Sequence, residues 1–269
     1  MFSKSSFAGF MAILGLLFFV SCGVNKQEKI NAQDELVVGL NSGFPPYEVL
    51  NSQGQFEGFD IDVANQIAIK MGKKLVIKDM AFDALIMSLK QEKIDLIISG
   101  VSISPHKLQE IDMVHYQGDA TKTIGLYFWE KIPAGVSNIT DLKHLENKNV
   151  YTQAGMTVTE DFLVSTGGLD VTCLENIADL VMALKYGKAI AVALDVMIGN
   201  ALKKQSPELV MLEIALPEKY HSFGYGIGIK KNKHDLKAQV NKIILELKNN
   251  KTLTQLEQKW FAGGSHANS

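Results

Sequence analysis

Residues 58–80 read GFDIDVANQIAIKMGKKLVIKDM, and this stretch indicates the fold class. Its apolar side chains recur at the spacing of one helix face, at Ile61, Ala64, Ile67, Ala68 and Met71. Gly72 is a typical stop signal for such a helix, and LVIKDM shortly after it has the character of a strand. We therefore predict a helix followed directly by a strand.

Helix and strand alternate on both sides of this stretch. Before it, the run from Leu36 predicts a strand, a proline-containing loop and a second extended segment. After it, residues 82–90 predict an amphipathic helix, and IDLIISG from Ile94 predicts a short strand buried on both faces. In the second half, LYFWEK, NVYTQAG and AIAVALD predict strands, and TVTEDFLVST and VMIGNALKK predict helices. The fold class is therefore α/β, with a mainly parallel sheet and a second α/β lobe.

The chain ends in a strand-like segment and two helical segments. HSFGYGIGIKK follows Tyr220, and HDLKAQVNKIILELKNN and TLTQLEQKWF come after it. The pattern alone does not assign these helices to a lobe. The spaced glycines of GYGIG lack the GxGxxG order that opens onto a helix in nucleotide-binding loops, so they predict backbone flexibility at a crossing between lobes.

Composition excludes several functions. The 269 residues carry a formal net charge of −2, and a scan finds that all 27 basic side chains are lysine. Nucleic acid calls for a basic face, so it is not an expected partner. No metal-ligand or catalytic motif is found, and Asp60 and Asp62 at a helix start are read as helix-capping and dipole residues. We expect no cofactor and no metal.

The first residues have the layout of a secretory signal. MFSKSSFAGFMAILGLLFFVSC holds Lys4, then an apolar run from Phe7 to Val20 that is too short to span a bilayer, then Ser21 and Cys22. This layout resembles a bacterial lipobox, although Phe19 stands where leucine is more usual. We expect residues 1–21 to be removed and Cys22 to carry a lipid. The alternative is an ordinary signal peptide that happens to contain a cysteine.

Several segments resemble one family in the same order along the chain, from about Leu36 to Phe261. They are GFDIDVANQIAIKMG, FDALIMSLKQEKIDLIISGVSIS, NVYTQAGMTV, GKAIAVALD, YGIGIKKNKHDL and LEQKWF. Together they are similar to the solute-binding proteins of polar amino-acid ABC importers. The resemblance implies a type II periplasmic-binding-protein fold, with two α/β lobes around a cleft and two crossings between them.

The resemblance also implies the organisation of the chain. After a tether over residues 22–35, the first lobe takes residues 36–119 and returns with residues 222–262, and the second lobe takes residues 120–221. A flexible tail, residues 263–269, follows. A ligand in the cleft contacts both lobes and draws them together. The expected partners are a small amino acid, an ABC permease and, through the lipid, a membrane, and the protein is expected to be an exported monomer.

The family pattern assigns groups of the first lobe to the carboxylate of the ligand. In SGVSISPHK these are Ser99 and Gly100 at a strand end, the hydroxyl of Ser102, and the base Lys107. Most relatives have arginine at the last position, and a lysine offers a point charge instead of two parallel hydrogen bonds. Either arginine has drifted to lysine across an arginine-free chain, or the carboxylate is held differently. Without the motif, Lys107 reads as a solvated helix lysine.

The second lobe supplies the remaining charged contact. The resemblance places the backbone of Gly155 and the hydroxyl of Thr157 at the carboxylate, and Asp195 at the ammonium. A buried zwitterion needs each charge paired, which gives this assignment its chemical reason. The alternative for Asp195, which follows a buried strand, is the N-cap of the next helix.

Selection of the side chain is expected from the first loop and from a second aromatic ring. Asn41 and Phe44 align with pocket positions of the family, and Phe82 begins FDALI. Two rings can hold an aliphatic or guanidinium stem, or they simply pack in the core. Glu48 meets a cationic head or lies at a solvated edge. Arginine is slightly favoured as the ligand, with glutamine or another polar amino acid as the alternative.

Two other functions are compatible with this fold. One is an exported enzyme, such as a dehydratase or a wall-cleaving module, and the other is a solute sensor. An enzyme needs an acid or a base in the cleft, and no His, Glu or Cys stands in a matched motif at the expected positions. We therefore predict a binding protein without catalytic residues.

Overall fold

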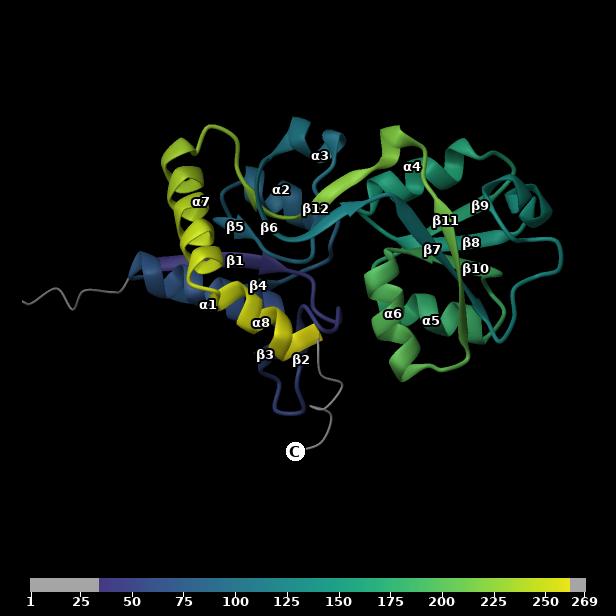
Figure 1. Cartoon of the computed structure of the whole chain (residues 1–269), viewed down its shortest axis with the longest axis horizontal. Coiled ribbons are helices and arrows are strands. Elements are labelled where there is room, and N and C mark those ends of the chain that lie inside the picture. The colour runs from purple at the N-terminus through teal and green to yellow at the C-terminus, as the bar shows by residue number, and fades with distance from the viewer. Residues whose placement is uncertain (1–33, 262–269) are drawn as a thin grey trace, which may run out of the picture. The chain divides into compact units, whose positions relative to one another are not determined.

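Two five-stranded sheets form the framework of residues 34–261, the part of the chain that the computed structural model describes (Figure 1). The first sheet has the order β4-β1-β5-β12-β6. Its strands are β1 (Glu35–Leu40), β4 (Lys74–Asp79), β5 (Leu96–Ile97), β6 (Asp112–Thr121) and β12 (Ser222–Ile229). Residues from the beginning and the end of the described chain therefore share one sheet.

The second sheet has the order β11-β7-β10-β8-β9 and is built from one continuous part of the chain. Its strands are β7 (Thr123–Trp129), β8 (Asn149–Gln153), β9 (Asp170–Leu174), β10 (Ala191–Leu194) and β11 (Leu209–Ala215). The chain enters this sheet directly after β6 and leaves it before β12. The two crossings expected from the family resemblance thus follow from the strand order.

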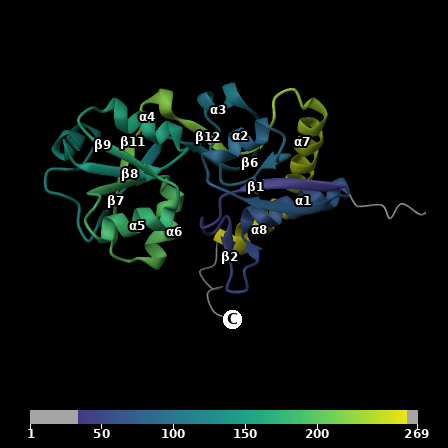
Figure 2. The same cartoon turned by 180° about the vertical axis from the view of Figure 1, so that it is seen from behind.

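Helices cover both sheets, as the view from behind also shows (Figure 2). The first lobe contains the first sheet, five helices and a small hairpin. The helices are α1 (Phe59–Met71), α2 (Ala84–Lys90), α3 (Pro105–Glu110), α7 (His234–Asn249) and α8 (Thr252–Phe261), and the hairpin consists of β2 (Val49–Leu50) and β3 (Phe56–Glu57). The second lobe contains the helices α4 (Thr157–Ser165), α5 (Ile177–Lys185) and α6 (Val196–Gln205) and the 3-10 helices η1 (Ile139–Leu145) and η2 (Glu218–Tyr220). The terminal helices α7 and α8 contact each other and α1, so they belong to the first lobe.

The expected parallel arrangement is confirmed for four strands of each sheet, whereas one strand of each sheet, β12 in the first and β7 in the second, is reversed. In the first, β1 runs parallel to β4 and β5, whereas β12 runs antiparallel to β5 and β6. In the second, β8 runs parallel to β9 and β10, whereas β7 runs antiparallel to β10 and β11. The antiparallel pairs all involve β7 or β12, the strands next to the crossings, where the chain changes lobe.

The helix predicted within residues 58–80 is confirmed as α1, and features of its own sequence explain where it forms and ends. Its apolar face is buried, and Gly72 takes a left-handed conformation and donates its N–H to the carbonyls of Ala68 and Ile69. The expected capping role of Asp60 and Asp62 is wrong, since no side chain caps this helix. Both carboxylates bind distant partners instead: Asp62 accepts from the indole of Trp260 at 2.7 Å.

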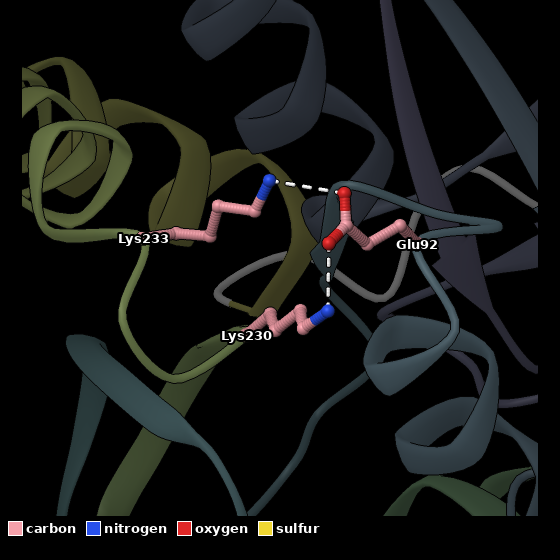
Figure 3. A network of polar contacts seen from close by, with 3 residues as sticks. All are labelled: Glu92, Lys230 and Lys233. Carbon is pink, nitrogen blue, oxygen red and sulfur yellow. Dashed lines mark hydrogen bonds and ion pairs between the residues drawn. The ribbon is translucent and has the colours of Figure 1, made fainter.

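An ion-pair network joins two parts of the first lobe that are far apart in sequence (Figure 3). Glu92, in the turn after α2, accepts from Lys230 at 2.6 Å and from Lys233 at 3.0 Å. Both lysines lie between β12 and α7. They hold the pKa of Glu92 at about 2, below its ordinary value. The network therefore links the returning segment to the first part of the lobe.

Several predictions fall on residues 1–33 and 262–269, outside the described residues. They include the signal segment, the lipid on Cys22 and most of the tether. β1 begins at Glu35, the last residue assigned to that tether. Within residues 34–261 we find no helix of the length and apolar character that crossing a membrane requires.

Candidate functional site

A cavity that is partly open to solvent is lined by residues of both sheets and their loops. Eight of the ten predicted ligand residues line it: Asn41, Phe44, Phe82, Ser99, Gly100, Ser102, Lys107 and Asp195. They come from segments up to 154 positions apart, because 195 − 41 = 154. The folding of the chain therefore brings nearly all of the predicted site to one place.

Ser99 and Gly100 follow β5, and their polar groups already have partners. The Ser99 hydroxyl donates to Oε1 of Glu48 at 2.6 Å and accepts the N–H of Asn41 at 3.0 Å. The Gly100 N–H donates to Oδ2 of Asp60 at 2.7 Å. This N–H is therefore turned inward and is not offered to a ligand, unlike the contact expected from the family pattern. Ser102, two positions further on, also lines the cavity.

Two buried carboxylates lie next to this strand end. Glu48 is fully buried and lines the cavity, and its Oε2 has no hydrogen-bond partner among the described residues. Asp60, also buried, accepts from the hydroxyl of Tyr116 at 2.7 Å. Burial raises the pKa of Glu48 well above its ordinary value and that of Asp60 to about 7, the neighbouring Asp60 charge adding to the rise at Glu48. The alternative of a solvated Glu48 is therefore wrong.

Lys107 is a buried base that lines the cavity. It lies in α3, a single short turn of helix whose N-cap Ser104 accepts the Lys107 N–H. Its side chain is only 4% exposed, and it forms no ion pair among the residues that the structure describes. Burial lowers its pKa to about 8. The alternative of a solvated helix lysine is wrong, and the ammonium is placed to receive an anionic group.

Asp195 has the N-cap role weighed from the sequence, and it also lines the cavity. Its Oδ1 accepts the N–H of Met197 at 2.9 Å, and Asp195 is the N-cap of α6. The carboxylate is 8% exposed, and burial raises its pKa. A buried carboxylate is stabilised by a cationic partner. Asp195 is therefore suited to bind an ammonium group of a ligand.

Asn41 and two aromatic rings complete the predicted set. Both ends of the Asn41 amide have a partner: its Nδ2 donates to the Met80 carbonyl, and its Oδ1 accepts from Nε2 of Gln153 in the other lobe, each at 2.9 Å. Phe44 lies over Gly100, where an added Cβ would come within 2.6 Å of its ring. Phe82 lines the same cavity. The rings supply apolar wall, while Asn41 joins the two lobes.

The two remaining predicted ligand residues, Gly155 and Thr157, follow β8 in the second lobe. Gly155 is not a cavity-lining residue; it lies against the other lobe, and a Cβ there would come within 2.9 Å of the Phe82 ring and 3.0 Å of the Asp83 Cα. Its neighbours Gln153 and Met156 line the cavity. Thr157 begins α4, and its side chain lies outside what the structure describes.

Sequence reasoning missed several lining residues, Tyr225 above all. Tyr225 sits in GYGIG, where the glycines directed attention to the backbone. Thr121, Thr123 and Ser222 line the cavity at the two crossings, where no motif marks them. Tyr116 and Gln117, near the end of the first-lobe segment, do not line it; Gln117 accepts from the Tyr47 hydroxyl at 3.1 Å.

Two α/β lobes joined by two crossings, with buried acidic and basic side chains facing one cavity, define a two-lobed solute-binding protein. The profile of the bacterial extracellular solute-binding proteins, family 3, matches residues 36–263. The chain belongs to this family. This confirms the fold and the family predicted from the sequence, and with them solute binding as the function.

Relatives and solved structures agree with the family match. The chain is 32% identical to the probable ABC transporter arginine-binding protein ArtJ of Chlamydia trachomatis serovar D, with 96% of each chain covered. An ancestral arginine-binding protein bound to arginine superposes with a TM-score of 0.76 at 28% identity, covering 86% of this chain and 99% of the other. The same coverage and identity, with a TM-score of 0.75, are found for an ancestral arginine-binding protein bound to glutamine.

Proposed function

We propose that the protein captures arginine outside the cytoplasm and delivers it to an ABC permease. The observation that carries this proposal is the set of ionisable groups in the cavity wall: two carboxyl groups, on Glu48 and Asp195, and one amine, on Lys107. Arginine has two cationic groups and one carboxylate, the complement of that set. The arginine-binding relatives support the same choice.

Each charged group of arginine has a counterpart in this assignment. Lys107 and Ser102 take the carboxylate, with Thr157 from the second lobe, and Asp195 takes the α-ammonium. The guanidinium stem lies between Phe44 and Phe82 and points its head toward Glu48. Ser99 and Gly100 shape the floor through their inward hydrogen bonds, and Gly155 serves the closure of the lobes.

Glutamine is the alternative, and two observations favour arginine over it. A neutral side-chain amide leaves the unpartnered Oε2 of Glu48 without a cation. Asn41, the residue best suited to bind an amide, already uses its side chain to join Met80 and Gln153. Arginine therefore satisfies more of the cavity's polar groups than glutamine does.

Binding rather than catalysis is proposed as the whole activity of the site. No histidine or cysteine is found in the cavity wall within residues 34–261. We further propose export by residues 1–21, lipid attachment at Cys22, a tether over residues 22–35, and a monomer. The lobe boundaries 36–119 with 222–262, and 120–221, are supported by the sheet to which each strand belongs.

A thermal-shift panel of amino acids on the purified protein tests this function. A ligand at 100 times its dissociation constant stabilises the folded state by about 2.7 kcal/mol, which raises Tm by several degrees. We expect arginine to give the largest rise and Asp195→Ala to abolish it. A panel in which no amino acid shifts Tm would refute the proposal.

A further inference from the structure

Tyr225 presents a buried hydroxyl without a partner at the wall of the ligand cavity. It lies on β12, the strand that leads back into the first lobe, and is 3% exposed. Its hydroxyl has no hydrogen-bond partner among the described residues, although the side chain lines the cavity. A buried hydroxyl without a partner costs free energy, so such a group in a binding cavity points to a partner that arrives with the ligand.

Other buried tyrosines of this protein do not share this property. The Tyr116 hydroxyl donates to Asp60 at 2.7 Å, and the Tyr127 hydroxyl approaches the Val196 carbonyl at 3.3 Å and the Met211 sulfur at 3.0 Å. Neither side chain lines the cavity. The Tyr225 ring packs against Tyr47, with centroids 5.5 Å apart, but the Tyr47 hydroxyl donates to Gln117. The isolated hydroxyl is thus specific to the tyrosine at the cavity.

Asp195 is the group of the opposite lobe that can accept this hydroxyl. Both residues line the same cavity, and one carboxylate oxygen of Asp195 is engaged by the Met197 N–H, whereas its other oxygen has no partner among residues 34–261. Burial raises the pKa of Asp195, and the Met197 N–H and the nearby Tyr225 hydroxyl oppose that rise. Among the described residues, the cavity wall therefore holds an unpartnered hydroxyl on Tyr225 and an unpartnered carboxylate oxygen on Asp195.

We propose that Tyr225 is a positioning residue of the ligand site, whose hydroxyl donates to Asp195 when the ammonium of a bound amino acid occupies the cavity. The hydrogen bond holds the carboxylate in its ionised form and orients it toward the ligand. It also joins the second crossing strand to the opposite lobe, so ligand occupancy and lobe closure support each other. This inference rests on the proposed function, because Asp195 must be the partner of the ammonium.

Tyr225→Phe is the direct test, because it removes only the hydroxyl and keeps the ring. A hydrogen bond to a charged group is worth enough to weaken the dissociation constant for arginine roughly tenfold or more. The Tm of the ligand-free protein should stay unchanged or rise, since no hydrogen bond is lost in that state. Tyr116→Phe, the matched control, removes a satisfied hydroxyl and should lower this Tm.

The pH profile of arginine affinity separates positioning from a structural role. The Tyr225 hydroxyl opposes the rise in the pKa of Asp195 already in the ligand-free protein, so in Tyr225→Phe the affinity should begin to fall at a higher pH on acidification than in the wild type. The titratable groups around Asp195 remain the same in both proteins: Tyr47, Tyr127, Glu48 and Lys107. A shift of this acidic limb in Tyr225→Phe, and none in Tyr127→Phe, is the expected result.

The outcomes distinguish this inference from the proposed function. If the wild type binds arginine and Tyr225→Phe binds it equally well with the same pH profile, the inference is overturned and the function stands. If the wild type binds no amino acid, the proposed function falls and the inference falls with it. The inference is supported if Tyr225→Phe binds arginine more weakly than the wild type does, its ligand-free Tm is not lowered, and its arginine affinity begins to fall at a higher pH on acidification.

Discussion

Lys107 shows at the level of a single residue why we propose that the ligand carries a carboxylate. Its ammonium is buried without a carboxylate partner among the described residues, and burial alone lowers its pKa to about 8. In the ligand-free protein this charge is a cost, which a bound carboxylate offsets. The arginine of most relatives would offer two parallel hydrogen bonds where lysine offers a single charge.

Lys107→Met should therefore weaken arginine binding by at least about 100-fold, because it removes one partner of a buried ion pair. The ligand-free protein should keep or raise its Tm, since a buried charge is lost. Lys107→Arg should preserve or tighten binding. Lys74→Met, which removes an exposed lysine paired with Glu35, is the matched control and should leave affinity unchanged. Loss of affinity in Lys107→Arg would contradict the carboxylate assignment.

The pH dependence of arginine affinity follows from the same residue. A carboxylate beside Lys107 raises its pKa in the complex, so binding takes up a proton wherever the free protein has lost it. As far as Lys107 is concerned, affinity should be level between pH 7 and about pH 8 and fall above about pH 8, up to the pKa of the bound state. Calorimetry between pH 7 and pH 9.5 measures this, and affinity that stays level over the range would show that Lys107 does not pair with the ligand.

Glu48 and Asp60 make a second prediction, which concerns stability. Both have pKa values raised by burial, Asp60 to about 7, so the folded state binds more protons than the unfolded state above their ordinary values near 4. The free energy of unfolding should therefore fall as the pH rises from about 5 to about 7. Glu48→Gln should remove the contribution of Glu48 to this slope in urea denaturation and leave that of Asp60, whose pKa is raised by its own burial. An unchanged slope would assign it to other groups.

At the scale of elements, the loop after β8 determines how closely the lobes approach each other. Gly155 has φ of 86° and lies against Phe82 and Asp83, where a Cβ has no room. The hydrogen bond from Gln153 to Asn41 joins the lobes at the same place. The loop is therefore shaped for the closed arrangement.

Gly155→Ala should weaken arginine binding about tenfold, because the added methyl group opposes closure in addition to the backbone strain of roughly 1 kcal/mol. Gly167→Ala is the matched control: its φ is 74°, with the same kind of strain, but a Cβ there meets nothing within 4 Å. It should lower Tm without a comparable loss of affinity. Equal affinities for the two variants would argue against a role of this loop in closure.

How far the sequence predicts these elements depends on how local their cause is. α1 and its end at Gly72 follow from apolar spacing and one glycine, and they are confirmed. The Gly100 N–H turns inward because Asp60, 40 positions away, accepts it, and no local pattern contains that information. Tyr225 was missed for a similar reason, since its hydroxyl gains meaning only beside Asp195 from the other lobe.

At the scale of the whole molecule, the site exists because the chain crosses twice between two sheets. The chain leaves the first sheet after β6 and returns to it at β12. Residues at these two crossings line the cavity together with residues of both lobes. The family resemblance predicted this arrangement, whereas strand patterns alone predicted mainly parallel sheets but not the reversed strands β7 and β12. Strand direction at a crossing depends on the path of the chain, which residue patterns do not encode.

The central claim is that this cavity selects arginine by charge. Calorimetric titration of the purified protein with arginine and with glutamine, at pH 7 and in the same buffer, tests it most directly. We expect one arginine to bind per chain, more tightly than glutamine. The difference between the two affinities should be smaller in Glu48→Gln. Tighter binding of glutamine, or no heat with either amino acid, would contradict it.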